Sequence, residues 1–196
     1  TNAPSFQANN LNPLPGVQRE LNQISATLPN NDKRENENFT KANLQAIIDR
    51  VPFPVVHIAT HGQFSSNAEK TFILDWNGEI NVKDLDGLLR GINRKRPIEL
   101  LVLSACETVA GDSRAALGLA GVAVRAGARS TLATLWQVND ESTALFMSEF
   151  YSELAQSKGQ VNKAEALRRA QVKLLKDSKY QHPYFWAPYV LVGNWK

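Results

Sequence analysis

Residues 100–108 read LLVLSACET, and this stretch is the clearest guide to the fold. It opens with four apolar residues, Leu100 to Leu103, a pattern typical of a strand buried on both faces of a parallel sheet. The predicted strand ends at Ser104, and Cys106, the only cysteine in the chain, follows closely. Ligands in open α/β sheets bind outside the carboxyl ends of the strands. The stretch therefore predicts a mostly parallel sheet with a functional site at that edge.

A second buried strand is predicted at residues 55–60, VVHIAT, and His61 and Gly62 follow it. An imidazole can take the proton of a thiol and pass it to a leaving amine, so His61 and Cys106 would form a base and a nucleophile if the two strands are neighbours. The backbone amides of Gly62 and Cys106 would then be available as an oxyanion hole. A lone cysteine is more often buried and inert, so the pattern alone leaves both interpretations open.

Strands and helices alternate along the chain, which predicts an α/β sandwich. Residues 1–12 are polar and aperiodic, and we expect a tail or linker there. Residues 63–70 are expected to be a polar, mobile segment, and residues 107–114 a loop. Further strands are expected at residues 71–76, 130–135 and 189–193, and helices at residues 13–29, 41–50, 82–90, 115–126, 141–156 and 162–177.

The composition argues against several classes of protein. The net charge is +3 and the basic residues are scattered, so no nucleic-acid partner is expected. No apolar run approaches the ~18 residues of a membrane span, so no membrane partner is expected either. One cysteine cannot form an internal disulfide, which favours a reducing, cytoplasmic location. One cysteine and three dispersed histidines give no metal-ligand spacing, no phosphate-binding loop occurs, and we expect neither a metal nor a cofactor.

Four motifs occur in a fixed order along the chain: IATHGQF around His61, LVLSACET around Cys106, ATLWQVND at residues 133–140 and HPYFWAPYVLVG at residues 182–193. In these four motifs and their order the sequence resembles the CHAT domain family of caspase-like cysteine peptidases, and the resemblance covers residues 13–196. The resemblance implies a caspase-haemoglobinase-like three-layer sandwich and a cysteine endopeptidase that acts on peptide or protein substrates. It assigns His61 as base, Cys106 as nucleophile, and the Gly62 and Cys106 amides as oxyanion donors.

CHAT domains often follow tetratricopeptide arrays in bacteria, especially cyanobacteria. The resemblance therefore implies an upstream tetratricopeptide or other regulatory region, and because the chain begins at Thr1 rather than Met we expect it to be a piece of a longer protein. Members of such families can also lose activity, so a non-enzymatic interaction module remains the alternative.

One position departs from relatives that cleave after basic residues, which often carry an acid two positions before the cysteine. Ser104 stands there in this chain. We expect Asp140 to supply the missing acid and to favour Arg or Lys at P1, the alternative being that Asp140 caps the helix that follows it. Glu107 in the cysteine loop and Trp136 in the pocket wall are further candidates for substrate binding.

The two other histidines are interpreted as structural. His57 lies in the middle of the first predicted strand, and we expect a hydrogen-bonded core or edge histidine. His182 precedes Pro183 in the aromatic closing segment and is also expected to have a structural role.

Overall fold

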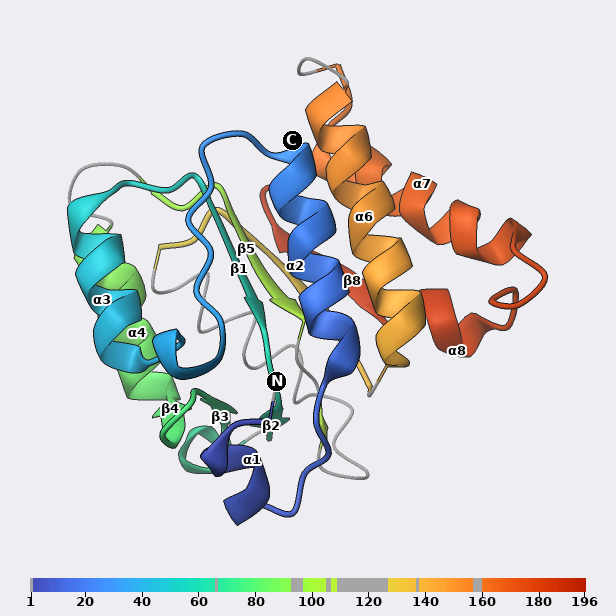
Figure 1. The fold of residues 1–196 in the computed structure, drawn as a ribbon. Coiled ribbons are helices and arrows are strands. Elements are labelled where there is room, and N and C mark those ends of the chain that lie inside the picture. Colours follow the sequence, from blue (N-terminus) through green and yellow to red (C-terminus); the bar gives the residue numbers. More distant parts are fainter. Residues whose placement is uncertain are drawn as a thin grey trace.

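The computed structural model describes residues 2–65, 67–92, 97–104, 107–108, 127–136, 138–156 and 160–196 (Figure 1). Within these residues the chain forms a three-layer sandwich, in which a mostly parallel sheet lies between two groups of helices. This architecture confirms the predicted α/β sandwich and agrees with the caspase-like arrangement that the resemblance implies.

The central sheet has the strand order β1-β5-β7-β8. The first three strands are parallel, and β8 runs antiparallel to β7 at the far edge. Strand β5 sends Leu101 and Leu103 into one core and Leu100 and Val102 into the other, which explains its unbroken apolar run. The strands are β1 (Val55–Ala59), β5 (Leu100–Ser104), β7 (Ser130–Thr134) and β8 (Tyr189–Gly193).

Each face of the central sheet is covered by helices. Helices α3 and α4 share a core with β1 and β5 on one face, whereas α2, α6 and α7 pack on the other. Thr40 caps α3, because its side chain accepts a hydrogen bond from Asn43 N at 3.2 Å. The helices are α1 (Pro4–Ala8), α2 (Pro15–Thr27), α3 (Lys41–Arg50), α4 (Val82–Ile92), α6 (Asp140–Gln156), α7 (Lys163–Lys176) and α8 (Pro183–Trp186), with 3-10 turns η1 (Asn36–Asn38) and η2 (Ala68–Lys70).

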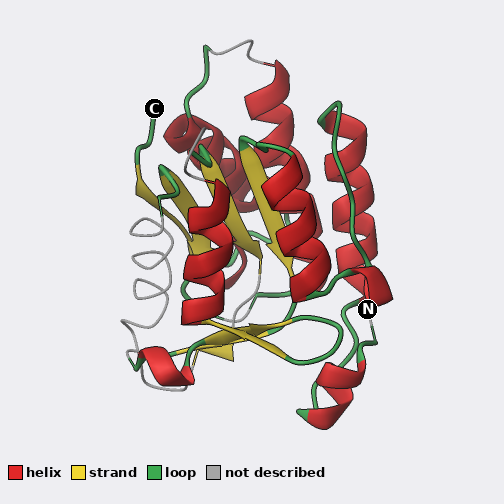
Figure 2. Cartoon of the chain, turned by 90° about the vertical axis from the view of Figure 1, so that its left-hand side faces the viewer, coloured by secondary structure: helices red, strands yellow, loops and turns green. Residues whose placement is uncertain are grey.

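A second, smaller sheet crosses the end of the central sheet (Figure 2). Its order is β4-β3-β2-β6, and β2 is antiparallel to β3 but parallel to β6. Because β2 follows β1 and β6 follows β5 along the chain, the small sheet lies beyond the carboxyl ends of β1 and β5. Its strands are β2 (Gly62–Phe64), β3 (Phe72–Leu74), β4 (Glu79–Asn81) and β6 (Glu107–Thr108).

Two expectations differ from the structure. Residues 63–70, expected to be mobile, contribute β2 and η2, and the Phe64 side chain is buried. Residues 4–8, within the expected tail, form α1, where Phe6 is buried. A three-residue strand and a one-turn helix are too short to show a period, so their burial depends on partners distant in the sequence. The expected helix at residues 115–126 and most of the expected loop at residues 107–114 lie outside the described residues.

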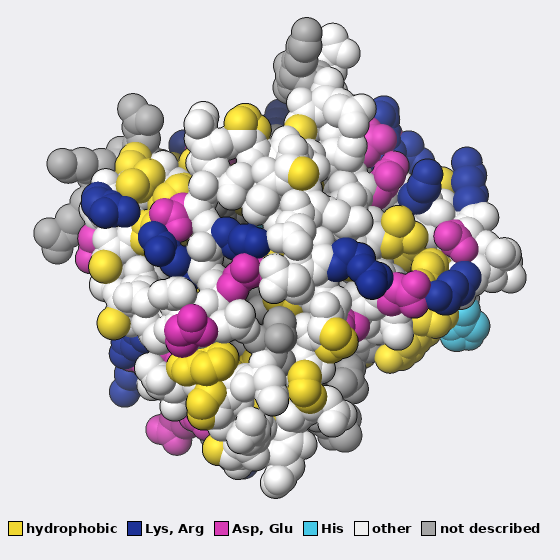
Figure 3. Space-filling model, in the orientation of Figure 1, with side chains coloured by type: hydrophobic (Ala, Val, Ile, Leu, Met, Phe, Trp, Pro, Cys, Tyr) yellow, Lys and Arg dark blue, Asp and Glu magenta, His cyan; other side chains and the backbone are white. Residues whose placement is uncertain are grey.

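The surface carries charges of both signs. On the face shown in Figure 3, Lys and Arg side chains are interspersed with Asp and Glu. None of the described helices is long and apolar enough to cross a bilayer.

Candidate active site

The candidate site lies where β1 and β5 end. These strands are parallel neighbours, and their register runs to the pair of Ala59 with Ser104. Pairing resumes beyond the site, where Gln63 lies opposite Glu107. The predicted adjacency of the two strand ends is therefore confirmed. His61 follows β1 within this interval, whereas Cys106 lies outside the described residues.

The imidazole of His61 is held by the amino-terminal segment of the chain. Its Nε2 lies 2.8 Å from the carbonyl oxygen of Asn12. Because a carbonyl oxygen only accepts, Nε2 carries a proton, and Nδ1 is the nitrogen left with a lone pair when the ring is neutral. The ring of Phe6 packs edge-on against the imidazole, with centroids 4.6 Å apart. His61 could therefore act as a base through Nδ1 without disturbing this hydrogen bond.

Gly62 is the first residue of β2, and β3 lies directly against it. A Cβ at this position would lie 2.9 Å from the carbonyl oxygen of Phe72 and 3.0 Å from Cγ2 of Ile73. Such contacts are too short for a real side chain, so the packing of the small sheet already requires glycine. This packing is a reason for glycine that is separate from the oxyanion role expected of its amide.

Asp140 lies in the first turn of α6 and faces the same segment. Its carboxylate accepts a hydrogen bond from the backbone N–H of Gly16. Burial raises the pKa of Asp140, and the charge of Glu20 adds to the rise, whereas the Gly16 bond and the charges of His61 and Arg19 lower that pKa. Asp140 and His61 are thus both contacted by the amino-terminal segment, through Gly16 and Asn12 respectively.

The cap of α6 is Asn139, not Asp140. The Asn139 Oδ1 atom accepts from Ser142 N at 3.0 Å, which is the side-chain bond expected of a helix N-cap. The alternative interpretation of Asp140 as the N-cap is therefore wrong, and its carboxylate is directed instead at Gly16.

The other candidates for substrate binding are Ser104, Trp136 and Glu107. Ser104 is partly exposed at the end of β5. The indole N–H of Trp136 donates to the carbonyl oxygen of Tyr184 at 3.1 Å, which ties the loop after β7 to α8. Glu107 pairs through its backbone in β6, and its side chain lies outside the described residues.

His57 belongs to a buried polar group behind the site. Its Nε2 lies 3.0 Å from Oε1 of Glu20, and its Nδ1 lies 3.0 Å from the hydroxyl of Tyr151. Burial, together with the charge of Glu20, holds the pKa of Tyr151 well above its usual value. The prediction of a hydrogen-bonded histidine is confirmed, and the group joins α2 and α6 to β1.

The burial of Glu20 was not predicted from the sequence, although the position of this residue in α2 indicates it. It lies on the same helical face as the apolar residues Val17 and Ile24, where a charged residue needs a buried partner. The identity of that partner, His57 on a distant strand, depends on tertiary structure.

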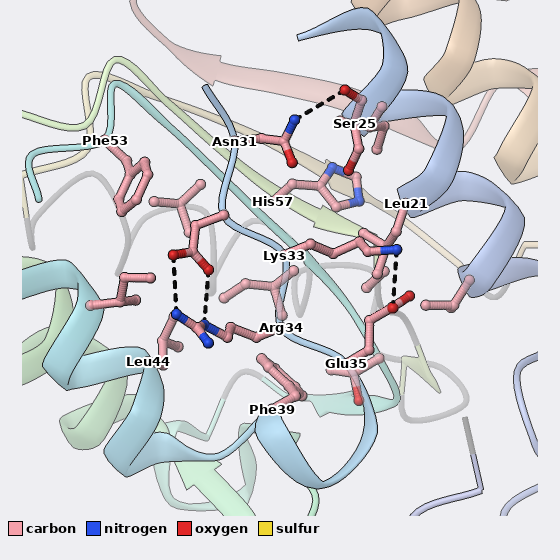
Figure 4. Close-up of a pocket in the computed structure, with 18 of the residues that line it drawn as sticks. Leu21, Ser25, Asn31, Lys33, Arg34, Glu35, Phe39, Leu44, Phe53 and His57 are labelled. Atoms are coloured by element: carbon pink, nitrogen blue, oxygen red, sulfur yellow. Dashed lines mark hydrogen bonds and ion pairs between the residues drawn. The ribbon is translucent and has the colours of Figure 1, made fainter. Parts of the chain in front are cut away.

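A cavity of about 330 Å³ lies over β1, between α2 and α3 (Figure 4). Its walls are largely apolar and include Leu21, Leu44 and Phe53, while residues 29–36 cross it. Two ion pairs lie along this crossing segment, Arg34 with Asp32 and Lys33 with Glu35. The cavity extends to the amino-terminal segment that contacts His61, because Phe6 and Leu14 also line it.

A comparison with known protein families identifies the domain that contains this site. Among the described residues, no group of three or more His, Cys, Asp or Glu side chains could hold a metal ion. A family model described as the CHAT domain matches residues 1–194. The chain belongs to the CHAT family. This membership identifies a caspase-like domain and supports a role in peptide hydrolysis. A comparison with curated proteins found no match.

Proposed function

We propose that this CHAT domain is a cysteine endopeptidase domain in which Cys106 is the nucleophile and His61 the base. The observation that carries the proposal is the strand pairing on both sides of the site. Ser104 lies opposite Ala59, and Glu107 lies opposite Gln63. His61 and Cys106 each follow the pair of Ala59 and Ser104 by two residues in the sequence.

The proposed reaction requires a neutral His61 ring with its lone pair on Nδ1 and its proton on Nε2, whether that proton is donated to Asn12 or to water. Nδ1 accepts the thiol proton of Cys106, and the thiolate attacks the carbonyl carbon of the scissile peptide bond. The tetrahedral oxyanion accepts hydrogen bonds from the Gly62 and Cys106 amides. The protonated ring then gives its proton to the leaving amine, and a water molecule, deprotonated by the same ring, hydrolyses the thioester and restores the thiol.

We further propose that Asp140 selects Arg or Lys at P1. Ser104 is neutral, whereas Asp140 is a partly buried carboxyl group that contacts the same amino-terminal segment as His61. Burial makes this group costly to ionise without a counter-charge, so a substrate cation would be bound favourably there. Trp136 and Glu107 are proposed as further parts of the substrate site. The chain has one cysteine and so cannot form an internal disulfide, and on this ground we propose a reducing, cytoplasmic location.

Cleavage of fluorogenic peptides with Arg, Lys, Asp or Leu at P1 tests the proposal. We expect turnover of the Arg and Lys peptides, loss of turnover in Cys106→Ala, and loss of the basic preference in Asp140→Asn. Cys106→Ser is the conservative companion, and circular dichroism checks that each variant is folded. Unchanged turnover in Cys106→Ala would contradict the nucleophile assignment, and a preference for Asp or Leu would contradict the role of Asp140.

A non-enzymatic binding module is the second candidate, and one observation favours it. Asn12 and Phe6 contact His61, so the candidate base already has protein partners. The reactivity of the thiol separates the two functions. A Cys106 that reacts with electrophiles, and reacts more slowly in His61→Ala, supports the peptidase, whereas an inert Cys106 supports the binding module.

A further inference from the structure

Residues 2–16, which we call the cover, lie against both His61 and Asp140. They comprise α1, the loop that follows it and the first turn of α2 (Figure 1). The cover contacts His61 through the Asn12 carbonyl oxygen, 2.8 Å from Nε2, and through the Phe6 ring. It contacts Asp140 through the Gly16 N–H. The two described residues with proposed roles in proton transfer and P1 recognition are thus engaged by one segment of the same chain.

The outer part of the cover is anchored by a small apolar cluster. Ala3 and Phe6 are buried against Leu74 of β3. The hydroxyl of Ser5 donates to the carbonyl oxygen of Asp75, next to that strand. These contacts belong to the small sheet, so the cover bridges the small sheet and α6.

The backbone hydrogen bonds of the cover are mostly internal. The amides of residues 9–11 donate to the carbonyl groups of Phe6 and Gln7. Pro13 and Pro15 have no N–H, so this part of the chain has few donors for bonds to the rest of the domain. The cover could therefore leave His61 as a unit without breaking its own hydrogen bonds.

The packing beneath the cover is incomplete. The cavity over β1 reaches Phe6 and Leu14, so these side chains face unfilled space on one side. Atoms that line a void lack the dispersion contacts of a close-packed interior. Beyond the cover, Glu20 of α2 is joined to His57, which fixes the helix just after the point where the cover ends. The cavity therefore lies beside both the cover and α2, and only α2 is also joined to β1 by the pair of Glu20 and His57.

We propose that the cover is an intramolecular inhibitor, and that lifting it from His61 and Asp140 opens the site to substrate. This inference rests on the peptidase function proposed above. While the cover is in place, the Phe6 ring and the Asn12 carbonyl oxygen contact the imidazole of His61. The Gly16 N–H donates a hydrogen bond to the Asp140 carboxylate, which is the group that would bind a P1 cation. Substrate binding then requires a minor, open population, and the apparent affinity falls by the open fraction.

Two substitutions weaken the cover without altering His61 or Asp140. Phe6→Ala removes the ring that packs on the imidazole and its burial against Leu74. Gly16→Ala places a methyl group against the Asp140 carboxylate, which must move or break its bond to residue 16. Gly87→Ala in α4 is the matched control, because a Cβ there has no neighbour within 4 Å among the described residues.

Accessibility of His61 can be measured without reference to catalysis. Diethyl pyrocarbonate modifies accessible, neutral imidazoles, and peptide mapping by mass spectrometry gives a rate for each histidine. His182 is exposed and serves as the internal reference, whereas His57 is buried within its polar group. We expect His61 to react more slowly than His182 in the unaltered protein. In Phe6→Ala and Gly16→Ala, but not in Gly87→Ala, we expect this difference to shrink.

Cleavage of Arg- and Lys-peptides is measured on the same samples. A rise of about tenfold in kcat/KM in both cover variants, with no change in Gly87→Ala, would support the proposal. Equal modification of His61 and His182 in the unaltered protein would overturn it. Loss of His61 protection without any change in a measurable cleavage rate would overturn the inhibitory role while leaving the peptidase intact. Loss of protection with no cleavage in any variant would instead contradict the peptidase function and leave the cover as a shield of His61.

Discussion

Removing Glu20 should destabilise the domain, because this carboxyl group is the buried partner of His57. The exposed fractions of the two side chains are 1% for Glu20 and 7% for His57, and their atoms lie 3.0 Å apart. Breaking such a pair costs about 3 kcal/mol, since the remaining group loses its partner away from water. For a domain of this size that corresponds to a fall in Tm of roughly 6–12 °C.

Urea denaturation of Glu20→Ala, His57→Ala and the double variant measures this coupling. The double variant should lose less stability than the sum of the single variants, with a difference of about 1–3 kcal/mol. Glu153→Ala is the control, because its pair with Arg169 is exposed to solvent and should be worth less than about 1 kcal/mol. A loss in Glu20→Ala no larger than in the control, or strict additivity, would refute the role assigned to the pair.

Because the folded-state pKa of Asp140 is raised, the stability of the domain should fall as the pH rises from the ordinary carboxyl pKa through the raised value. Asp140→Asn should therefore have a higher Tm than the unaltered protein at pH 7 but not at pH 3; a lower Tm at pH 7 would contradict this reasoning. Gly62→Ala should lose about 2 kcal/mol in urea denaturation, because its Cβ would lie 2.9 Å from the Phe72 oxygen, whereas Gly78→Ala should change stability little. Asn139→Ala should lose about 1 kcal/mol as the cap of α6, and a larger loss in Asp140→Ala would reverse that assignment.

The central sheet could be predicted because its strands carry their own signal. The unbroken apolar run of β5 indicates burial on both faces, whereas β1, at the sheet edge, alternates between partly buried and buried residues. Parallel neighbours bring their carboxyl ends to one edge. The position of His61 beside the end of β5 followed from these two facts.

The cover and the polar group of His57 could not be predicted in the same way. The contact of Asn12 with His61 is made by a backbone carbonyl group. Every residue carries such a group, so the contact cannot be predicted from the type of side chain. Glu20 and Tyr151 meet His57 from two different helices, and only the packing of those helices brings them together.

The proposed peptidase activity requires a nucleophilic thiol assisted by His61. The rate at which an electrophilic peptide with Arg at P1 labels Cys106 tests this directly. Mass spectrometry should find the label on Cys106 in Gly16→Ala, in which the cover is weakened. His61→Ala in that background should slow labelling by about 100-fold or more, whereas His182→Ala should leave the rate unchanged. An unlabelled Cys106, or equal rates with and without His61, would contradict the account.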